Sequence, residues 1–411
     1  MKEDFRDVIV IGGGPSGLVA SIAARRAGAG VLLLEKNPRV GKKLLTTGNH
    51  QCNLTNMDIR AKHYHGDPGF AMRTIARFDR DRTLEFFRAL GLETVADESG
   101  KVYPRSYQAG SVLDVLRFEL DRLRVETLAD CAVETLRSGR DGFAVRTKEG
   151  RTCSAHRVIL CAGGHAAPQT GSTGAGFILA QSLGHTILEP FPALVQLKLD
   201  GAVHKAMEGM KWECSVALFA DGIAEAQERG DILFTSYGLS GTAALNVSRT
   251  AVAALRDGKR VEIKLNLVPE MEEAELGEAI RRRIEIQPER PMEEFFTGWL
   301  NKRIGQTLIK ALAFDRAAPW RSLSDADVRR LTEALHGWTF TVTGDTGWPN
   351  AQTTAGGVDT REVDAETMES RKVPGLFFAG EILNVDGDSG GYNLQWAWSS
   401  GFVTGQAAAA V

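Results

Sequence analysis

The first 35 residues hold a strand, a glycine-rich turn, a helix and a second strand in one short unit. Residues 7–11 are an apolar run rich in β-branched side chains, which favours a strand, and residues 12–17 read G-x-G-x-x-G. The alanine-rich stretch 18–27 has helical spacing, and a second apolar run, 31–34, ends at Glu35. Because strands frame the turn and an acid follows it, the sequence predicts a dinucleotide-binding unit rather than a simple glycine turn.

The residues of the turn suit close contact with phosphate groups. Gly12 allows a tight exit from the strand, Gly14 lets the backbone approach a pyrophosphate, and Gly17 lets the helix pack against the strand. The helix that follows the turn has unpaired N–H groups at its N-terminus, and the positive end of its dipole attracts anions. We therefore expect a pyrophosphate at this turn.

Glu35 is the expected partner of a ribose. It follows Gly17 by 18 residues, near the spacing of the acid that binds a ribose 2′-hydroxyl in this type of unit. An acid at this position favours an adenosine without a 2′-phosphate. The expected cofactor is thus FAD or NAD rather than NADP.

The composition excludes several classes of protein. A chain of 411 residues with 43% hydrophobic residues is long enough for two or three domains. A net charge of −3 gives no global reason to expect a nucleic acid or an anionic membrane, although local basic patches remain open. The five cysteines are scattered without a C-x-x-C pair, so neither a disulfide framework nor a metal site is expected. We expect a cytoplasmic protein without a signal peptide or membrane span.

The loop after Glu35 is the second candidate for cofactor binding. Residues 36–56, KNPRVGKKLLTTGNHQCNLTN, have little periodicity and include the cations Arg39, Lys42 and Lys43. Long irregular segments are often functional, so this loop is predicted to wrap the adenosine and pyrophosphate and reach the reactive ring. The alternative is a solvated surface loop. Cys52 is single where flavin disulfide reductases carry two cysteines, so a redox disulfide is not expected.

The middle of the chain provides scaffold and a second glycine turn. Amphipathic helices are predicted over residues 73–90 and 110–123, and a β-hairpin over residues 129–147. A strand then leads into CAGG at residues 161–164, where Ala162 and Gly163 are placed to approach a cofactor. The following GSTGAG lacks the G-K-[ST] ending of a P-loop, which argues against nucleotide hydrolysis.

Residues 191–354 have a different character. Short apolar runs separated by turns predict a small β-rich module, and residues 269–335 are charged and helical. The arginines at 281–283 are read as a solvated helix face rather than an anion site. No second G-x-G-x-x-G occurs, so no dedicated Rossmann domain for a nicotinamide dinucleotide is expected.

The C-terminal part returns to cofactor binding. A strand over residues 373–379 ends at Gly380 and Glu381, and a helix is expected over about residues 394–410, starting near Tyr392 and Asn393. Its positive end would stabilise negative charge on the pyrimidine side of a reduced flavin. The run of Asn384, Asp386 and Asp388 lacks the glycine and closing acid of a calcium loop. The two ends of the chain are therefore predicted to form one domain.

With these segments assembled, the chain resembles the BaiN/YhiN-type flavoproteins, FAD-containing NAD(P)-linked oxidoreductases distantly similar to the glutathione reductase superfamily. The resemblance spans nearly the whole chain and rests on VIVIGGGPSG, KKLLTTGNHQCNLTN, VYPRS, GSTGAG, LFTSYGLSGTAAL, TMES and GLFFAGEILNVDGDSGGYNLQWAWSSG. It implies an α/β fold with a Rossmann-type FAD-binding domain at residues 1–190 and 355–411. A β-barrel-like insert would occupy residues 191–267 and 337–354, and a helical insert residues 268–336.

The resemblance also implies a set of FAD-binding residues. Ser16 and its glycines would hold the pyrophosphate, Glu35 the ribose, the backbone of Val133 the adenine, and Glu381 the ribityl or phosphate region. Asn393 and Leu394 would meet the flavin ring. The complete expected set is Gly12, Gly14, Pro15, Ser16, Gly17, Glu35, Lys36, Lys43, Gly48, Val133, Ala162, Gly163, Gly380, Glu381, Gly391, Asn393 and Leu394.

This sequence departs from the family pattern in two places. Where the family tends to read S-G-N-G-R-C-N, this chain has T-G-N-H-Q-C-N, with Thr47, His50 and Gln51 at the changed positions. Where the family tends to read F-T-H-x-G-x-S-G-P, Ser236 replaces the histidine and Thr242 the proline. Both stretches are expected to face the substrate, so the substrate is not transferred from the family.

The leading hypothesis is an FAD-dependent oxidoreductase that moves hydride through flavin N5. The resemblance suggests reduction of an activated C=C bond or oxidation of a small amine, with NADH or NADPH docking transiently as reductant. The catalytic acid or base is unassigned, with His50, Tyr237 and Tyr392 as candidates. An RNA-modifying flavoprotein and a non-catalytic flavin sensor are the alternatives. The expected partner is a small molecule; the oligomeric state is not predicted.

Overall fold

The computed structural model describes residues 5–410. The chain forms two compact units: Met1–Pro192 together with Ala351–Val411, and Ala193–Asn350. The first unit thus combines both ends of the chain, as the glycine signals at both ends predicted. Each unit has its own hydrophobic core.

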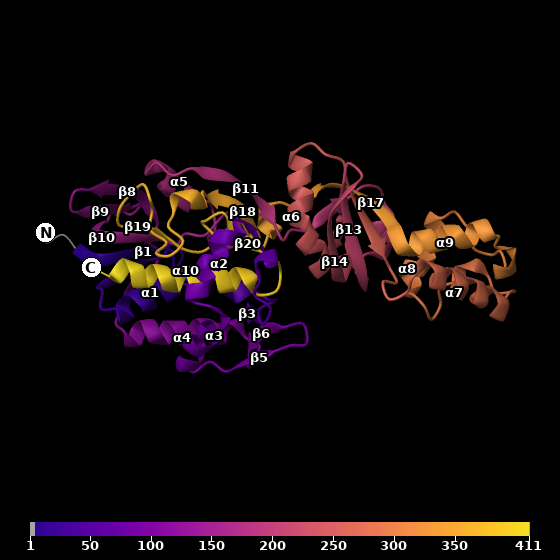
Figure 1. Cartoon of the computed structure of the whole chain (residues 1–411), viewed down its shortest axis with the longest axis horizontal. Helices are drawn as coiled ribbons and strands as arrows, with labels where there is room; N and C mark the ends of the chain where they lie inside the picture. Colours follow the sequence, from indigo (N-terminus) through magenta and orange to yellow (C-terminus); the bar gives the residue numbers. More distant parts are fainter. Residues whose placement is uncertain (1–4, 411) are drawn as a thin grey trace. The chain divides into compact units, whose positions relative to one another are not determined.

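The first unit is organised around a seven-stranded sheet, drawn in Figure 1. Strands β7, β2, β1, β10 and β19 run parallel, and the hairpin of β8 and β9 pairs antiparallel with the first half of β10. The second half of β10 pairs with β19 instead, so the C-terminal segment completes a sheet begun at the N-terminus. The bounds are β1 Phe5–Ile11, β2 Val31–Leu34, β7 Glu126–Leu128, β8 Val133–Gly139, β9 Gly142–Thr147, β10 Thr152–Leu160 and β19 Leu376–Phe378.

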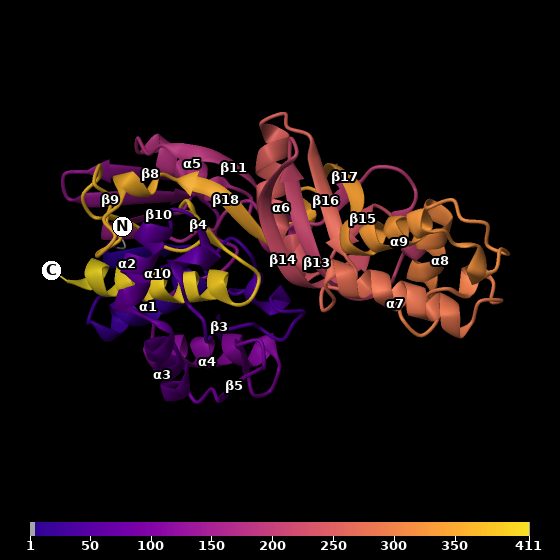
Figure 2. The same cartoon turned by 45° about the vertical axis from the view of Figure 1, so that its right-hand side comes forward.

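Helices α1 and α10 lie side by side against this sheet (Figures 1 and 2). Small residues allow the two backbones to approach closely. A Cβ atom on Gly401 would lie 2.4 Å from the carbonyl oxygen of Ser16, and one on Gly405 would lie 2.3 Å from that of Ala20. The first-unit helices are α1 Pro15–Arg26, α2 Pro68–Arg77, α3 Arg80–Ala89, α4 Ala109–Arg122, α5 Ala175–Ser182 and α10 Tyr392–Ala409.

The helix predicted over residues 73–90 is wrong in one respect, because two helices occupy the region. Helix α2 ends at Arg77, and α3 begins at Arg80 with Asp79 as its N-cap, whose side chain accepts from the amide of Arg82 at 2.9 Å. The apolar spacing continues through the break. The N-capping aspartate was the signal that separates the helices.

Three small sheets complete the first unit. Strand β20 pairs antiparallel with β4, and β6 lies between β3 and β5. Strands β11 and β18 form the third pair. Their bounds are β3 Thr55–Asn56, β4 Tyr64–Gly66, β5 Thr94–Ala96, β6 Lys101–Pro104, β11 Ile187–Ala193, β18 Thr353–Val358 and β20 Val385–Gly387.

The second unit contains a closed barrel of six strands in the order β12, β15, β14, β13, β16 and β17. Barrel residues such as Leu218 and Ile263 share one buried cluster with Leu276 and Leu308 of the helices, so barrel and helices have a common core. The bounds are β12 Leu197–Leu199, β13 Lys211–Ala220, β14 Ile223–Phe234, β15 Gly238–Ser240, β16 Val261–Asn266, β17 Trp338–Asp345, α6 Thr242–Arg256, α7 Glu273–Ile286, α8 Lys302–Ala311 and α9 Asp325–Gly337.

The division of this second unit into a β-rich and a helical insert domain stays a prediction. Among the helices of residues 5–410, none is both long and apolar enough to cross a membrane.

Candidate cofactor site

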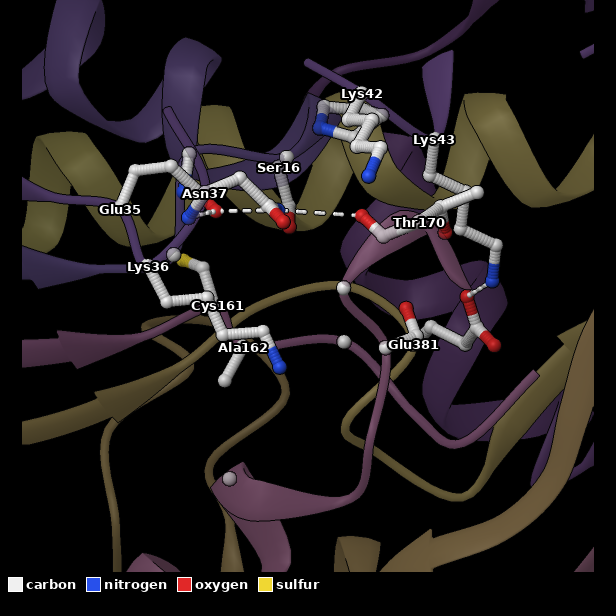
Figure 3. Close-up of a pocket in the computed structure, with 18 of the residues that line it drawn as sticks. Ser16, Glu35, Lys36, Asn37, Lys42, Lys43, Cys161, Ala162, Thr170 and Glu381 are labelled. Carbon is white, nitrogen blue, oxygen red and sulfur yellow. Dashed lines mark hydrogen bonds and ion pairs between the residues drawn. The ribbon is translucent and has the colours of Figure 1, made fainter. Parts of the chain in front are cut away.

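A cavity in the first unit lies at the carboxyl ends of β1, β2 and β10. Its walls come from distant parts of the chain: the glycine turn, the loop after β2, the hairpin, the turn after β10, and the start of α10. In an open parallel sheet this edge is where ligands bind. Figure 3 shows part of the lining, with labelled side chains from the glycine turn, the loop after β2, the turn after β10 and the C-terminal segment around one space.

Helix α1 begins at the cavity without a side-chain cap. Its N-cap is Gly14, no acid lies in its first turn, and Pro15 and Ser16 line the cavity. The amides of Ser16 and Gly17 have no acceptor within the helix. A Cβ atom on Gly14 would meet nothing within 4 Å, so open space adjoins these donors. The turn can therefore receive an anion.

Glu35 is held rigidly at the end of β2. One carboxylate oxygen accepts from the amide of Gly13 at 2.7 Å, and the other from the backbone and side-chain nitrogens of Asn37 at 2.8 and 2.7 Å. The side chain of Asn37 also donates to the carbonyl oxygen of Thr170 at 3.2 Å (Figure 3). Because a carboxylate has about four acceptor positions, Glu35 retains capacity for a further hydroxyl donor.

Four lysines line the cavity. Lys42 and Lys43 lie on the loop after β2, Lys36 directly follows Glu35, and Lys148 follows the hairpin. Lys36 donates to the hydroxyl of Thr173 at 2.8 Å. Burial lowers the pKa of Lys36, while Glu35 partly offsets this effect. The four cations make the cavity favourable for an anionic ligand.

An ion pair joins the N-terminal loop to the C-terminal segment across the cavity. The ammonium of Lys43 lies 2.6 Å from Glu381, as Figure 3 shows. The other oxygen of Glu381 accepts from the amide and hydroxyl of Thr354 at 3.0 and 2.8 Å. Glu381 is therefore fixed by two segments that are distant in sequence.

Two further helices begin at the cavity without side-chain caps. Ala175 and Gly176 open α5, and Asn393 and Leu394 open α10; all four line the cavity. Like α1, these helices have no acid in the first turn. The side chain of Asn393 is fixed by Gly387, accepting from its amide at 2.9 Å and donating to its carbonyl oxygen at 2.7 Å.

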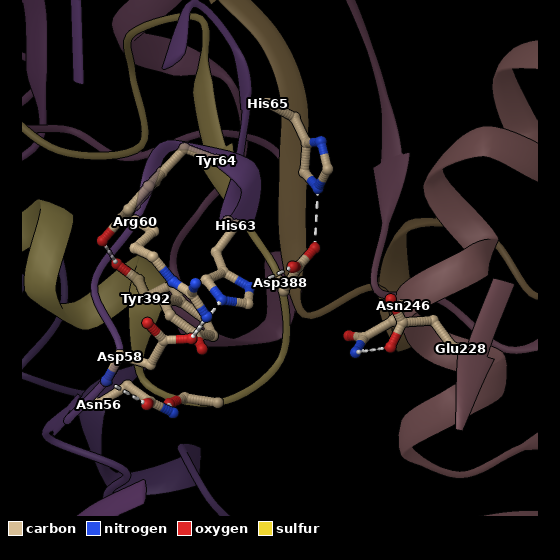
Figure 4. Close-up of polar contacts among 12 residues, drawn as sticks. Asn56, Asp58, Arg60, His63, Tyr64, His65, Glu228, Asn246, Asp388 and Tyr392 are labelled. Atoms are coloured by element: carbon tan, nitrogen blue, oxygen red, sulfur yellow. Dashed lines mark hydrogen bonds and ion pairs between the residues drawn. The ribbon is translucent and has the colours of Figure 1, made fainter. Parts of the chain in front are cut away.

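A polar network supports the segment that precedes α10 (Figure 4). Asp388 accepts from His65 at 2.8 Å and from His63 at 3.0 Å, and the other ring nitrogen of His63 lies 3.2 Å from Asp58. The ring of His63 stacks on Tyr392 with centroids 4.3 Å apart. This network holds the loop between β20 and α10 against β4.

The three candidates for an acid or base occupy different environments. Tyr392 is buried and packs on His63 and Tyr64, which indicates a structural role. Tyr237 lies in the second unit, where its carbonyl oxygen accepts from Leu199 at 3.0 Å. His50 is exposed on the loop after β2.

The structure brings most of the predicted cofactor residues together. Thirteen of them line the cavity: Gly12, Gly14, Pro15, Ser16, Glu35, Lys36, Lys43, Val133, Ala162, Gly163, Glu381, Asn393 and Leu394. The remaining four, Gly17, Gly48, Gly380 and Gly391, are not part of the lining; the first three directly adjoin lining residues in the chain, and Gly391 lies two residues before Asn393. Gly380 packs on Ser16, whose hydroxyl oxygen would lie 2.5 Å from an added Cβ.

Other lining residues were missed. Asn37, Lys148, Thr353 and the stretch 170–173 all border the cavity. The stretch 170–173 carried a signal, because G-S-T-G-A-G follows a cofactor-type turn. Lys148 and Thr353 carried none, since their position depends on how the hairpin and β18 pack.

These features fit an FAD molecule. The uncapped start of α1 and the lysines suit the pyrophosphate, Glu35 suits a ribose, and the start of α10 suits an electron-rich ring system.

Burial raises the pKa of Cys52 and of Cys161 to about 12, so neither presents a reactive thiolate.

Comparison with protein families decides the affiliation. The model described as HI0933-like protein Rossmann domain matches residues 6–407. The chain belongs to this HI0933-like family. The predicted resemblance to BaiN/YhiN-type flavoproteins is thereby confirmed, and the protein is an FAD-dependent oxidoreductase of this family.

Two curated relatives are similar over almost their full length. The chain is 40% identical over 403 residues to the 3-dehydro-bile acid delta(4,6)-reductase of Clostridium scindens, covering 97% of this chain and 98% of that protein. It is 31% identical over 410 residues to the ribosomal RNA dihydrouridine synthase of Escherichia coli, covering 97% of each chain.

Among solved structures, the 3-ketosteroid delta1-dehydrogenase of Sterolibacterium denitrificans, in complex with 1,4-androstadiene-3,17-dione, matches 99% of both chains with a TM-score of 0.50 and 13% identity. This similarity shows a shared fold.

Proposed function

We propose that this protein reduces C=C bonds conjugated with a carbonyl group in a small molecule, with FAD bound in the cavity and NADH or NADPH as the reductant. The observation that carries the proposal is the 40% identity, over nearly the full length of both chains, to a 3-dehydro-bile acid delta(4,6)-reductase. That name describes a ketone with nearby C=C bonds. A substrate of this chemical type accepts hydride because the carbonyl group withdraws electrons from the C=C bond.

The cavity supports the placement of FAD along its length. The start of α1, with Gly12, Gly14, Ser16 and Gly17, would hold the pyrophosphate, and Glu35 with Lys36 would hold the ribose. The backbone of Val133 would meet the adenine, while Lys43, Gly48, Ala162, Gly163, Gly380 and Glu381 would enclose the phosphates and ribityl chain. Gly391, Asn393 and Leu394 would meet the ring.

Reduced FAD supplies the hydride from N5. The residues of the protein control where the hydride is transferred. The uncapped start of α10 would direct its positive dipole end at the bound ring and stabilise negative charge there. Asn393, fixed by Gly387, holds this first turn in place.

The absence of a second dinucleotide motif supports a transient nicotinamide. G-x-G-x-x-G occurs once in the chain, and its cavity is assigned to FAD. NADH or NADPH would then bind transiently and leave before the substrate enters. Amine oxidation remains the competing redox reaction.

The experiment is an anaerobic stopped-flow titration of the flavin-loaded protein. NADH and NADPH are each added, and bleaching of the flavin absorbance is followed. The bleached protein is then mixed with a 3-oxo-4,6-diene steroid, or with the saturated 3-oxosteroid as a control. In a separate experiment, a primary amine is added to the oxidised protein. Bleaching by a nicotinamide and recovery by the dienone alone would support the proposal, whereas bleaching by the amine alone would replace it with amine oxidation.

A second candidate is reduction of uridine in ribosomal RNA, favoured by the 31% identity to a ribosomal RNA dihydrouridine synthase. Dihydrouridine is uridine with a reduced C=C bond next to a carbonyl group, so the chemistry is of the same class. The net charge of −3 gives no global attraction for RNA, while local basic patches remain open. Salt-dependent binding of ribosomal RNA, with dihydrouridine formed on addition of NADPH, would favour this candidate.

A further inference from the structure

The turn at residues 48–52 has an unusual backbone. Gly48, Asn49 and His50 have φ values of 55°, 52° and 69°, and Cys52 has a φ of 59°. Left-handed conformations cost about 1–2 kcal/mol for residues with a Cβ atom, although asparagine tolerates them better. Three residues with a Cβ atom, Asn49, His50 and Cys52, share this conformation within four positions, and such strain gathers at functional sites.

The turn lies at the end of the cavity where α10 begins. Leu44 and Thr47, just before the turn, line the cavity. Just after it, Thr55 donates to Gln395 of α10 at 2.6 Å, and Asn56 donates to the carbonyl oxygen of Gly390 at 2.9 Å. The turn is therefore fixed on one side to the cavity wall and on the other to the helix start where the flavin ring is expected.

The ring of His50 is held in one orientation. Its Nδ1 lies 2.8 Å from the carbonyl oxygen of Leu45, which can only accept, so Nδ1 carries a proton. The backbone carbonyl oxygen of His50 accepts from the amide of Ala109 at 2.8 Å, which fastens the turn to the start of α4. With Nδ1 occupied, Nε2 is the nitrogen left to exchange a proton with a ligand, and the exposed position gives it access to water.

From this arrangement we propose that His50 is the catalytic acid of the reduction, delivering a proton from Nε2 to the substrate. This inference rests on the proposed function. In the reaction, the β-carbon of the conjugated C=C bond receives hydride from reduced flavin, and the α-carbon receives the proton from Nε2. The substrate gains two hydrogens and two electrons, the flavin is oxidised, and the neutral imidazole regains its proton from water.

The bond to Leu45 suits this role. A protonated imidazole whose Nδ1–H is bound to a carbonyl oxygen presents Nε2–H as its only transferable proton. After transfer, the neutral ring keeps the Nδ1–H tautomer and needs no rotation before it is protonated again. His50 is exposed and lies three residues after Thr47, which lines the cavity.

The test uses His50→Gly, because glycine adopts the φ of 69° without strain, so the turn and the FAD site are retained. His50→Asn, which also tolerates this conformation, is the second variant, and Asn49→Gly is the matched control that alters the same turn and keeps the imidazole. We expect flavin bleaching by the nicotinamide to proceed as in the wild type for all three. Reoxidation by the dienone should slow by about 10²–10⁴-fold in both His50 variants and not in Asn49→Gly.

Two further readouts separate proton donation from a structural effect. Added imidazole should restore part of the reoxidation rate of His50→Gly. In ¹⁵N spectra of the wild type, the saturated ketone product should shift the Nε2 signal of His50 and leave its Nδ1 tautomer unchanged. Wild-type reoxidation rates in both His50 variants would overturn the inference while leaving the proposed function intact; failure of the wild type to reduce any conjugated ketone would overturn the proposed function itself.

Discussion

Helices α1 and α9 begin in opposite ways. Helix α9 starts with a capping box: the hydroxyl of Ser324 accepts from the amide of Asp327 at 3.2 Å, and Asp327 accepts from the amide of Ser324 at 3.0 Å. Helix α1 starts at Gly14, with no side-chain acceptor and open space beside its first amides. One helix satisfies its own N-terminus, and the other leaves its donors to a ligand.

The same contrast separates two carboxylates. Glu362 is satisfied within the protein by Lys372, His185 and the amide of Thr186, and it does not line the cavity. Glu35 is also hydrogen-bonded, but it lines the cavity and keeps acceptor capacity. Polar groups that face the cavity are held in position and still have hydrogen-bonding capacity for a ligand.

The largest expected effect comes from giving α1 a cap of its own. In Gly14→Asp, the new carboxylate would accept from the first-turn amides and repel the pyrophosphate. We expect FAD affinity to fall by at least about 100-fold, or about 3 kcal/mol, while the stability of the FAD-free protein changes by less than about 0.5 kcal/mol.

Titration of FAD into the FAD-free variant by fluorescence measures this affinity. Gly14→Asn provides an equally good cap without the charge, so it should retain more affinity than Gly14→Asp. Equal losses in the two variants would assign the effect to crowding instead of charge.

Removal of the Glu35 carboxylate tests the ribose end. Glu35→Ala leaves the buried amide of Gly13 and the amide of Asn37 without acceptors, which we expect to lower the unfolding free energy by about 2 kcal/mol. FAD affinity should fall by about 10- to 100-fold. Urea denaturation and the flavin content of the purified protein measure the two effects, and an unchanged flavin content would exclude Glu35 from the ribose site.

Acid titration tests Glu362, the carboxylate whose hydrogen bonds come from within the protein. Burial raises the pKa of Glu362, but the hydrogen bonds from Lys372 and Thr186 outweigh it, so the pKa falls from 4.5 to about 2. Because this pKa is lower than in the unfolded chain, the stabilisation is complete above pH 4.5 and is lost as the pH falls towards 2.

Glu362→Gln should therefore flatten this acid-side decline, by about 2 kcal/mol at most, since Lys372 is partly exposed. Chemical denaturation of both proteins across this range measures the change. A decline as steep in the variant as in the wild type would show that other carboxylates govern acid unfolding.

The smallest expected effect comes from removing the side-chain cap of α9. Ser324→Ala removes the capping box of α9 and should lower the unfolding free energy by about 1 kcal/mol. FAD content should stay at the wild-type level, because Ser324 lies in the second unit. If Ser324→Ala also lost flavin, this would contradict the distinction between α9, which is capped by its own side chains, and α1, whose start faces the cavity.

The sequence was most informative where backbone geometry needs particular residues. The turn from Gly12 to Gly17 and the acid at Glu35 follow from close approach and fixed spacing, and both lie at the cavity. The cavity residues Lys148 and Thr353 were not predictable, because only the packing of the hairpin and of β18 brings them there. Periodicity also overran the boundary between α2 and α3, where Asp79 ends one helix and begins the next.

The most direct test of the central claim is product analysis by mass spectrometry. Flavin-loaded protein, NADH or NADPH, and a 3-oxo-4,6-diene steroid are incubated without oxygen, with heat-inactivated protein as control. The account predicts a product that has gained two hydrogens across a C=C bond, with its ketone intact and one nicotinamide oxidised per molecule. Recovery of the dienone unchanged, although the nicotinamide has bleached the flavin, would contradict it.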